Sequence, residues 1–227
     1  MTDAAARVLF FDLDGCLVDS TEPIHVCLDA AMADHGLPPI PADRLDRHVG
    51  PPLQVTLLEL LAELGEDPNL VGGLMESYRQ RYATMSVERA ISYPGVPELV
   101  ADLDAAGERL GVVTSKPRRF AVPILEALDL DRHFEVMFGP GNTESEPKTV
   151  TLQRALDAVA PCDVASSLMI GDRHHDIDAA RNHGMSGVGV TWGFGSRAEL
   201  EAAGAIAVAD TAADLAAILG APGLVRS

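Results

Sequence analysis

The chain has 227 residues, with 34 acidic side chains against 17 basic ones and 47% hydrophobic residues. A chain of this length and composition can bury a full hydrophobic core, which excludes the disordered, fibrous and disulfide-stapled classes. Its formal charge of −17 disfavours a nucleic-acid polymer or an anionic membrane as partner, because like charges repel, so an anionic ligand must be held by local positive charge.

Short apolar, β-favouring runs alternate with helix-like stretches over most of the chain. The expected strands are residues 8–11, 110–114, 135–138, 167–170, 186–190 and 205–208. The expected helices between them are residues 97–106, 120–128, 149–159, 176–183, 198–203 and 212–219. This alternation predicts an α/β fold with a mainly parallel sheet, in which ligands bind beyond the carboxyl ends of the strands.

The pattern of predicted elements changes after the first strand. Amphipathic helical stretches at 24–35, 53–64 and 70–82 succeed one another without a convincing strand between them. We therefore expect residues 20–91 to form a helical domain inserted into an α/β core made of residues 1–19 and 92–227. Its hinges should lie near Asp19 and near Gly95, where a proline and a glycine mark the return to the core.

Cysteine usage and hydropathy bear on the compartment. The three cysteines show no CxxC spacing, which argues against a disulfide framework and against a zinc site. The sequence contains no run of about 18 apolar residues. It also shows no basic leader followed by an apolar stretch. These patterns favour a reducing cytoplasm and disfavour secretion and membrane spanning.

Two carboxylates, Asp12 and Asp14, follow the first strand in the segment FDLDG. Their spacing places both on the same side of an extended backbone, where they repel each other unless a cation or a shared proton joins them. A hard, oxygen-seeking cation such as Mg²⁺ satisfies such a pair. The alternative is an acidic surface turn, but the apolar run VLFF before the pair should hold it against the core.

Lysine is rare in this chain, since only Lys116 and Lys148 are lysines among the 17 basic residues. Lys116 follows Thr114 and Ser115 at the end of the second strand. Taken alone, these hydroxyls are equally well explained as helix N-caps, but combined with the acids they predict a phosphate-binding element. Lys148 precedes a helix on the same sheet edge, where its ammonium could reach the acids; an ordinary surface lysine is the alternative.

A second pair of acids, Asp172 and Asp176, follows the fourth strand in the segment GDRHHD. The two are about one helical turn apart, so both can face one ion. The alternative is a helix N-terminus whose acids match the dipole, and Asp178 fits that description better. His174 and His175 are expected outside the metal ligands, because a site rich in hard oxygen atoms has little need of imidazole.

The segments DLDG, VVTSK, Lys148 in its loop, and GDRHHD resemble motifs I to IV of the haloacid dehalogenase superfamily of phosphotransferases, in their expected order. The resemblance covers essentially the whole chain and implies a Rossmann-like core with an α-helical cap inserted after motif I. The segments TSKPRRFAVPILEALDL and WGFGS are most similar to phosphoglycolate phosphatase-like members. The loop before Lys148 departs from the usual lysine-proline start of motif III, because Glu146 stands before Pro147.

The resemblance implies a Mg²⁺-dependent hydrolase of a small phosphate monoester. Asp12 would be the nucleophile that forms an aspartyl phosphate, and Asp14 the general acid and base. Thr114 and Lys148 would hold the phosphoryl oxygens. The implied metal ligands are Asp12, the backbone carbonyl of Asp14, Asp172 and, as an outer ligand or as a group that orients Lys148, Asp176.

The substrate is expected to be a small phosphorylated metabolite selected by the cap, which excludes water and contacts the leaving group. The candidate substrate contacts are Ser115, Lys116, Arg118, Arg47 and Gly50, with His48 and Arg79 as further candidates in the insertion. Each arginine is equally well explained as a solvated residue on a helix face. A monomer and a homodimer are both open.

Other activities remain as alternatives. A β-phosphoglucomutase-like phosphotransferase would return the phosphoryl group to a sugar, and a receiver-like signalling domain would keep it on an aspartate. Dehalogenation is disfavoured because Asp14 supplies a proton that only a phosphate ester needs. The phosphonatase branch uses a cap lysine, and residues 20–91 contain none.

Overall fold

The computed structural model describes residues 6–41, 53–141 and 146–220. A six-stranded parallel sheet forms its centre, in the order β3-β2-β1-β4-β5-β6. The strands are β1 (Val8–Phe11), β2 (Arg109–Val113), β3 (Val136–Phe138), β4 (Leu168–Gly171), β5 (Ser186–Val190) and β6 (Ala207–Ala209). The α/β fold class with a parallel sheet is thereby confirmed.

Helices cover both faces of the sheet, as the alternation along β1 requires. Leu9 and Phe11 pack against one helical layer, and Val8 and Phe10 pack against the other. The first layer contains α5 (Val96–Ala105), α6 (Arg118–Ala127) and α10 (Ala212–Leu219), and the second contains α7 (Lys148–Ala158) and α8 (His174–Asn182). Helix α9 (Arg197–Ala203) contacts α8 and the last two strands. Because both faces are covered, all four residues of β1 are buried.

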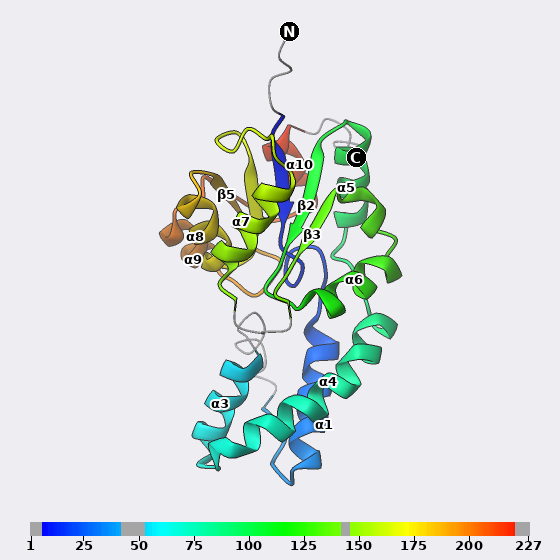
Figure 1. The fold of residues 1–227 in the computed structure, drawn as a ribbon, viewed down its shortest axis with the longest axis vertical. Coiled ribbons are helices and arrows are strands. Elements are labelled where there is room, and N and C mark those ends of the chain that lie inside the picture. Colours follow the sequence, from blue (N-terminus) through cyan, green and yellow to red (C-terminus); the bar gives the residue numbers. More distant parts are fainter. Residues whose placement is uncertain (1–5, 42–52, 142–145, 221–227) are drawn as a thin grey trace.

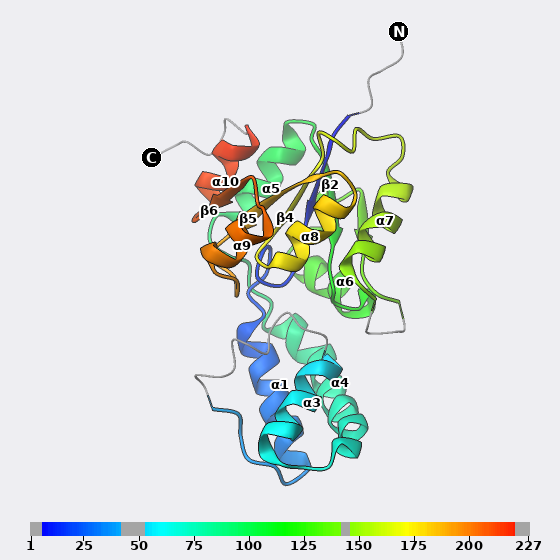
Figure 2. The same ribbon diagram turned by 90° about the vertical axis from the view of Figure 1, so that its left-hand side faces the viewer.

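A second hydrophobic core lies in the helices between β1 and α5. These helices are α1 (Thr21–Asp34), α3 (Leu53–Leu64) and α4 (Val71–Glu88), and they bury their own cluster around Leu28, Leu57 and Leu74. Figures 1 and 2 show them beyond the ends towards which the strands point. Phe120, from α6 of the α/β part, packs against this cluster. The carboxyl ends of the strands therefore face a helical unit.

Two linkers join the helical unit to the sheet and run side by side. The backbone N–H of Asp19 donates to the carbonyl of Ile91 at 2.9 Å, and Val18 forms an antiparallel bridge with Ser92. The Ser92 hydroxyl also donates to the Leu17 carbonyl at 2.8 Å. The first linker contains Asp19, and the second lies just before the 93–95 segment; their action as hinges stays a prediction.

Several element boundaries differ from the expected ones. Helix α4 continues to Glu88 and not only to Tyr82, because neither glycine nor proline interrupts the segment between them. Helix α8 begins at His174, two residues early, because carboxylates accept from the first backbone N–H groups: Arg173 N–H donates to Asp176 at 3.1 Å and His174 N–H donates to Glu199 at 3.0 Å. Strand β2 ends one residue before Thr114.

Within the described residues, no helix is long and apolar enough to cross a lipid bilayer.

Candidate active site

The carboxyl edge of the sheet gathers most of the side chains that the sequence singles out. Asp12 follows β1, Thr114 follows β2 and Asp172 follows β4, and β1 lies between β2 and β4. The strand connections change direction at β1, which makes this edge the expected ligand crevice. A pocket opens there between the sheet and the helical unit.

Both parts of the molecule line this pocket. From the sheet side it is lined by Asp12, Asp14, Thr114, Ser115, Lys116, Pro117, Phe120, Lys148, Asp172, Arg173, His175 and Asp176. From the helical side it is lined by Ile24, Leu28, Leu53, Thr56, Tyr78, Arg79 and Tyr82. Acids and lysines are therefore concentrated at one end, and apolar and aromatic side chains at the other.

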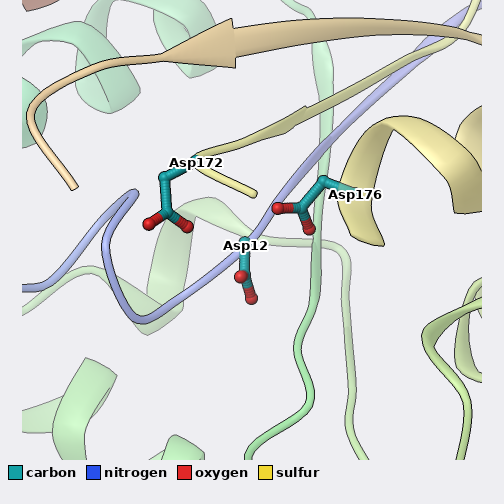
Figure 3. Close-up of side chains that lie close together, drawn as sticks. All are labelled: Asp12, Asp172 and Asp176. Carbon is teal, nitrogen blue, oxygen red and sulfur yellow. The ribbon is translucent and has the colours of Figure 1, made fainter. Parts of the chain in front are cut away.

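Three carboxylates form a buried cluster at the polar end. Asp12, Asp172 and Asp176 each offer an oxygen, and these oxygens lie within 4.8 Å of one another. Figure 3 shows the three side chains converging from the ends of β1 and β4 and from the start of α8. Burial raises the pKa of Asp12 to about 7 and, with the neighbouring acids, that of Asp172 to about 8. The positive charge near the cluster is therefore not enough to compensate three buried carboxylates.

Close backbone approach holds Asp172 in this position. The Phe194 N–H donates to Asp172 Oδ2 at 2.7 Å. Gly15, with φ +81, lies against the same oxygen: a Cβ at this position would be 2.3 Å from Asp172 Oδ2. A Cβ on Gly193 would lie 2.5 Å from it. These two glycines allow the loops after β1 and β5 to close around the carboxylate.

A divalent cation fits this donor set. Asp172 Oδ1 is buried and has no hydrogen-bond partner among the described residues. Its neighbours in the cluster are carboxylate oxygens, the donors that Mg²⁺ prefers. A cation between the three groups would satisfy the open oxygen and offset the burial and the repulsion that raise the pKa values of Asp12 and Asp172.

Lys148 connects this cluster to the predicted nucleophile. Its ammonium lies 2.7 Å from Asp12 Oδ2 and also bonds Asp176. Burial alone would lower the pKa of Lys148, but the Asp12 and Asp176 charges outweigh it and raise the pKa above its usual value. Lys148 is therefore a permanent cation beside Asp12.

Asp14 has different partners from Asp12. Its Oδ1 accepts hydrogen bonds from Lys116, 2.5 Å away, and from the Ser20 hydroxyl. Its side chain does not belong to the three-carboxylate cluster. The chain leaves the extended conformation after Phe11, and the two acids line the same pocket with different partners.

Thr114 directly follows β2 and lines the pocket with both lysines. It is buried, and its hydroxyl accepts from the Lys116 backbone N–H at 3.1 Å. Its own N–H donates to the Phe138 carbonyl at 3.0 Å, which fixes the loop after β2 to the end of β3. Ser115 is half-buried and lines the pocket.

The remaining candidates fall elsewhere. Arg118 is exposed and does not line this pocket; it borders a separate hollow near Glu135. Arg47, Gly50 and His48 lie outside the described residues. Their contacts with substrate therefore stay predictions.

Sequence reasoning missed the aromatic wall of the pocket. Tyr78 and Tyr82 stack at 5.0 Å between ring centroids, and Phe120 meets Tyr82 edge-on at 5.6 Å. A signal was available, because two of the three tyrosines in the chain stand four residues apart on one expected helix, and residues so spaced share a helix face.

Comparisons with known proteins agree with this geometry. Residues 9–190 match the family model described as haloacid dehalogenase-like hydrolase. The chain is 34% identical over 204 residues to a 5'-nucleotidase of Pseudomonas aeruginosa, which covers 89% of this chain and 91% of that protein. It is 30% identical over 194 residues to a phosphoglycolate phosphatase of Caulobacter vibrioides, covering 85% and 82% respectively.

Solved structures show the same fold. A putative phosphatase from Clostridium difficile superimposes with a TM-score of 0.85 at 29% identity, covering 96% of this chain and 100% of that one. The family match spans β1 through β5 and therefore every described acid and lysine of the pocket. The chain belongs to the haloacid dehalogenase-like hydrolase family, among its phosphatases.

Proposed function

We propose that this phosphatase hydrolyses a small phosphate monoester with Mg²⁺ through an aspartyl phosphate on Asp12, and that phosphoglycolate is the first substrate to test. The observation that carries the proposal is Lys148, which bonds both Asp12 and Asp176 beside the open oxygen of Asp172. The proposed nucleophile Asp12, the Lys148 ammonium and an Asp172 oxygen without a hydrogen-bond partner thus lie together in the pocket.

The residues divide the work of phosphoryl transfer as follows. An oxygen of Asp12 attacks phosphorus, and the ester P–O bond breaks as Asp14 gives a proton to the leaving oxygen. Water then attacks the phosphoryl group, Asp14 takes up its proton, and Asp12 is released with inorganic phosphate. Lys148 and the Thr114 hydroxyl hold the phosphoryl oxygens throughout, because positioning and charge neutralisation supply most of the catalysis.

Mg²⁺ would be held by Asp12, Asp172 and the backbone carbonyl of Asp14, with Asp176 as an outer ligand. When bound, it neutralises the charge that keeps a phosphate dianion away from a carboxylate nucleophile. Asp176 meanwhile keeps the Lys148 ammonium directed at Asp12.

Small size and negative charge are the expected properties of the substrate. Ser115 and Lys116 line the pocket next to Asp14 and are the proposed contacts for the group beyond the ester. The phosphoglycolate phosphatase relative makes a carboxylate the natural choice for that group. The 5'-nucleotidase relative makes nucleoside monophosphates the necessary comparison.

Phosphate release from a panel of esters tests the proposal. The panel contains phosphoglycolate, nucleoside monophosphates, sugar phosphates and pyrophosphate, each with and without Mg²⁺, and the Asp12→Asn protein is the blank. Metal-dependent release above the blank supports the proposal and ranks the substrates. Silence on every ester would contradict it.

Labelled water separates hydrolysis from the alternatives. In ¹⁸O water, hydrolysis places the label in free phosphate, whereas a β-phosphoglucomutase-like reaction passes the group to a sugar without the label. An aspartyl phosphate that persists without turnover would favour a receiver-like role. The cytoplasm stays the expected compartment.

A further inference from the structure

The pocket contains the only two lysines of the chain, and each holds one of the two proposed catalytic carboxylates. Lys148 lies 2.7 Å from Asp12, and Lys116 lies 2.5 Å from Asp14. Under the proposed function, the phosphoryl group binds beside Lys148. Lys116 is then a second buried cation whose present partner is a carboxylate that catalysis needs elsewhere.

The surroundings of Lys116 fix it at the boundary between sheet and cap. Its ammonium donates to the Tyr82 hydroxyl and lies 4.9 Å from the centroid of the same ring. Tyr82 is itself fixed between Tyr78 and Phe120. Lys116 is only 9% exposed, so water solvates its charge poorly.

Asp14 is the only carboxylate recorded within ion-pair distance of Lys116 among the residues that the structure describes. Despite burial, the Asp14 charge raises the pKa of Lys116 above its usual value, so the ammonium stays charged. A buried cation that loses its only carboxylate is strongly destabilised. Asp14 can therefore leave Lys116 readily only if another anion takes its place.

The catalytic role of Asp14 requires such a movement or release. The two hydrogen bonds that it accepts, from Lys116 and from Ser20, both reach Oδ1 and engage the carboxylate in the substrate-free protein. A general acid must instead present its oxygen to the leaving group of the ester. The contact with Lys116 thus competes with the catalytic position.

We propose that Asp14 occupies, in the substrate-free protein, the place on Lys116 that a second anionic group of the substrate takes, so that a substrate carrying this group releases Asp14 for catalysis and a neutral one does not. This inference rests on the proposed function, because it concerns the same pocket. It makes Lys116 a specificity-determining residue that acts through Asp14. It also assigns the substrate class: phosphate esters with a second negative charge close to the ester.

The exchange is tested with two esters of the same shape. 2-Phosphoglycolate carries a carboxylate, and 2-phosphoglycolamide carries a neutral carboxamide in the same place. For the wild-type protein with Mg²⁺ we expect kcat/KM to be at least about 100-fold higher for the acid. In Lys116→Met this ratio should fall at least about tenfold, because the acid loses its partner while the amide gains from a released Asp14.

Two further variants make the result specific. Arg132→Met removes an equal charge from an exposed position outside the pocket, and its ratio should stay within about twofold of the wild type. Tyr82→Phe keeps the ring and removes only the hydroxyl that Lys116 contacts. It should raise KM for the acid about threefold more than for the amide, and it carries the test if Lys116→Met does not fold.

The outcomes separate the exchange from the proposed function. A wild-type ratio near one, or an equal loss for both esters in Lys116→Met, overturns the exchange and leaves Lys116 as a positioning residue for Asp14, while the enzyme is still a phosphatase. No metal-dependent release from either ester, or from any other in the panel, overturns the proposed function itself. A ratio that collapses in Lys116→Met but not in Arg132→Met supports the exchange.

Discussion

Replacing Asp172 by asparagine should stabilise the metal-free protein at alkaline pH. Asp172 is 1% exposed, and burial, together with Asp176 and Asp12, raises its pKa to about 8. Asparagine keeps the shape of the side chain and an oxygen for the hydrogen bond from Phe194. The substitution therefore removes mainly a buried negative charge.

The pKa sets the size of the effect. The rise from 3.8 to about 8 corresponds to a ceiling of about 6 kcal/mol, at 1.36 kcal/mol for each unit. Asp12 lies in the same cluster and its titration is coupled to a neighbouring group, so removing one charge recovers only part of this energy. We expect a gain of about 2–4 kcal/mol, or about 5–12 °C in melting temperature for a chain of this size.

The gain should depend on pH with a definite sign. Because the pKa of Asp172 is raised on folding, the native protein keeps a proton that the unfolded chain has released between pH 3.8 and about 8. Wild-type stability from this group is therefore complete below pH 3.8 and is lost as the pH rises towards 8. The advantage of Asp172→Asn should grow over the same window.

Thermal unfolding followed by circular dichroism, in EDTA at about pH 5.5 and pH 8.5, measures this difference. Asp178→Asn is the matched control, because it removes the same charge from an exposed position on α8, the helix that follows Asp172. Adding Mg²⁺ at the higher pH should raise the melting temperature of the wild type more than that of Asp172→Asn. A variant that melts at or below the wild-type temperature at high pH, or that gains equally at both pH values, refutes the reasoning.

Four further substitutions test individual contacts. Asp12→Asn should lower phosphate release at least about 1000-fold with an unchanged circular dichroism spectrum, since the amide is a poor nucleophile; near-normal turnover would contradict the mechanism. Lys148→Met leaves Asp12 and Asp176 without their cation, so steady-state kcat should fall at least about 100-fold. Thr114→Val should lower kcat/KM about tenfold or more without changing Mg²⁺ affinity, measured by metal titration. Phe120→Ala should cost about 1–3 kcal/mol in denaturant unfolding and raise KM, because this ring joins the sheet layer to the cap cluster; an unchanged midpoint would contradict that packing.

The α/β core could be predicted because its signals are local. The run VLFF is apolar at four successive positions, a pattern typical of a strand covered on both faces. Strand β1 has the expected bounds. Helix ends were less predictable, because they depend on contacts made by the folded chain. His174 begins α8 early because its backbone N–H and its ring both contact Glu199, 25 residues away.

The acid cluster could be anticipated from strand order alone. Parallel strands end at the same edge, so acids that follow β1 and β4 meet once these strands are neighbours, and Leu9 pairs with Leu168 in that register. The partners of Asp14 could not be anticipated in this way. Lys116 is 102 residues from Asp14 and 34 from Tyr82, and their contact depends on how the cap lies over the sheet.

Charge compensation explains why two parts of the pocket's polar end should bind different ligands. Four carboxylates against two ammonium groups leave two uncompensated negative charges among Asp12, Asp14, Asp172, Asp176, Lys116 and Lys148. The raised pKa values locate this excess at the three-carboxylate cluster, where one divalent cation would cancel it. Elsewhere in the polar end, Lys116 and Asp14 already balance each other. A divalent cation is therefore expected at the cluster, whereas under our proposal a second anion entering beside Lys116 displaces Asp14, which links substrate recognition to the release of the proposed catalytic acid.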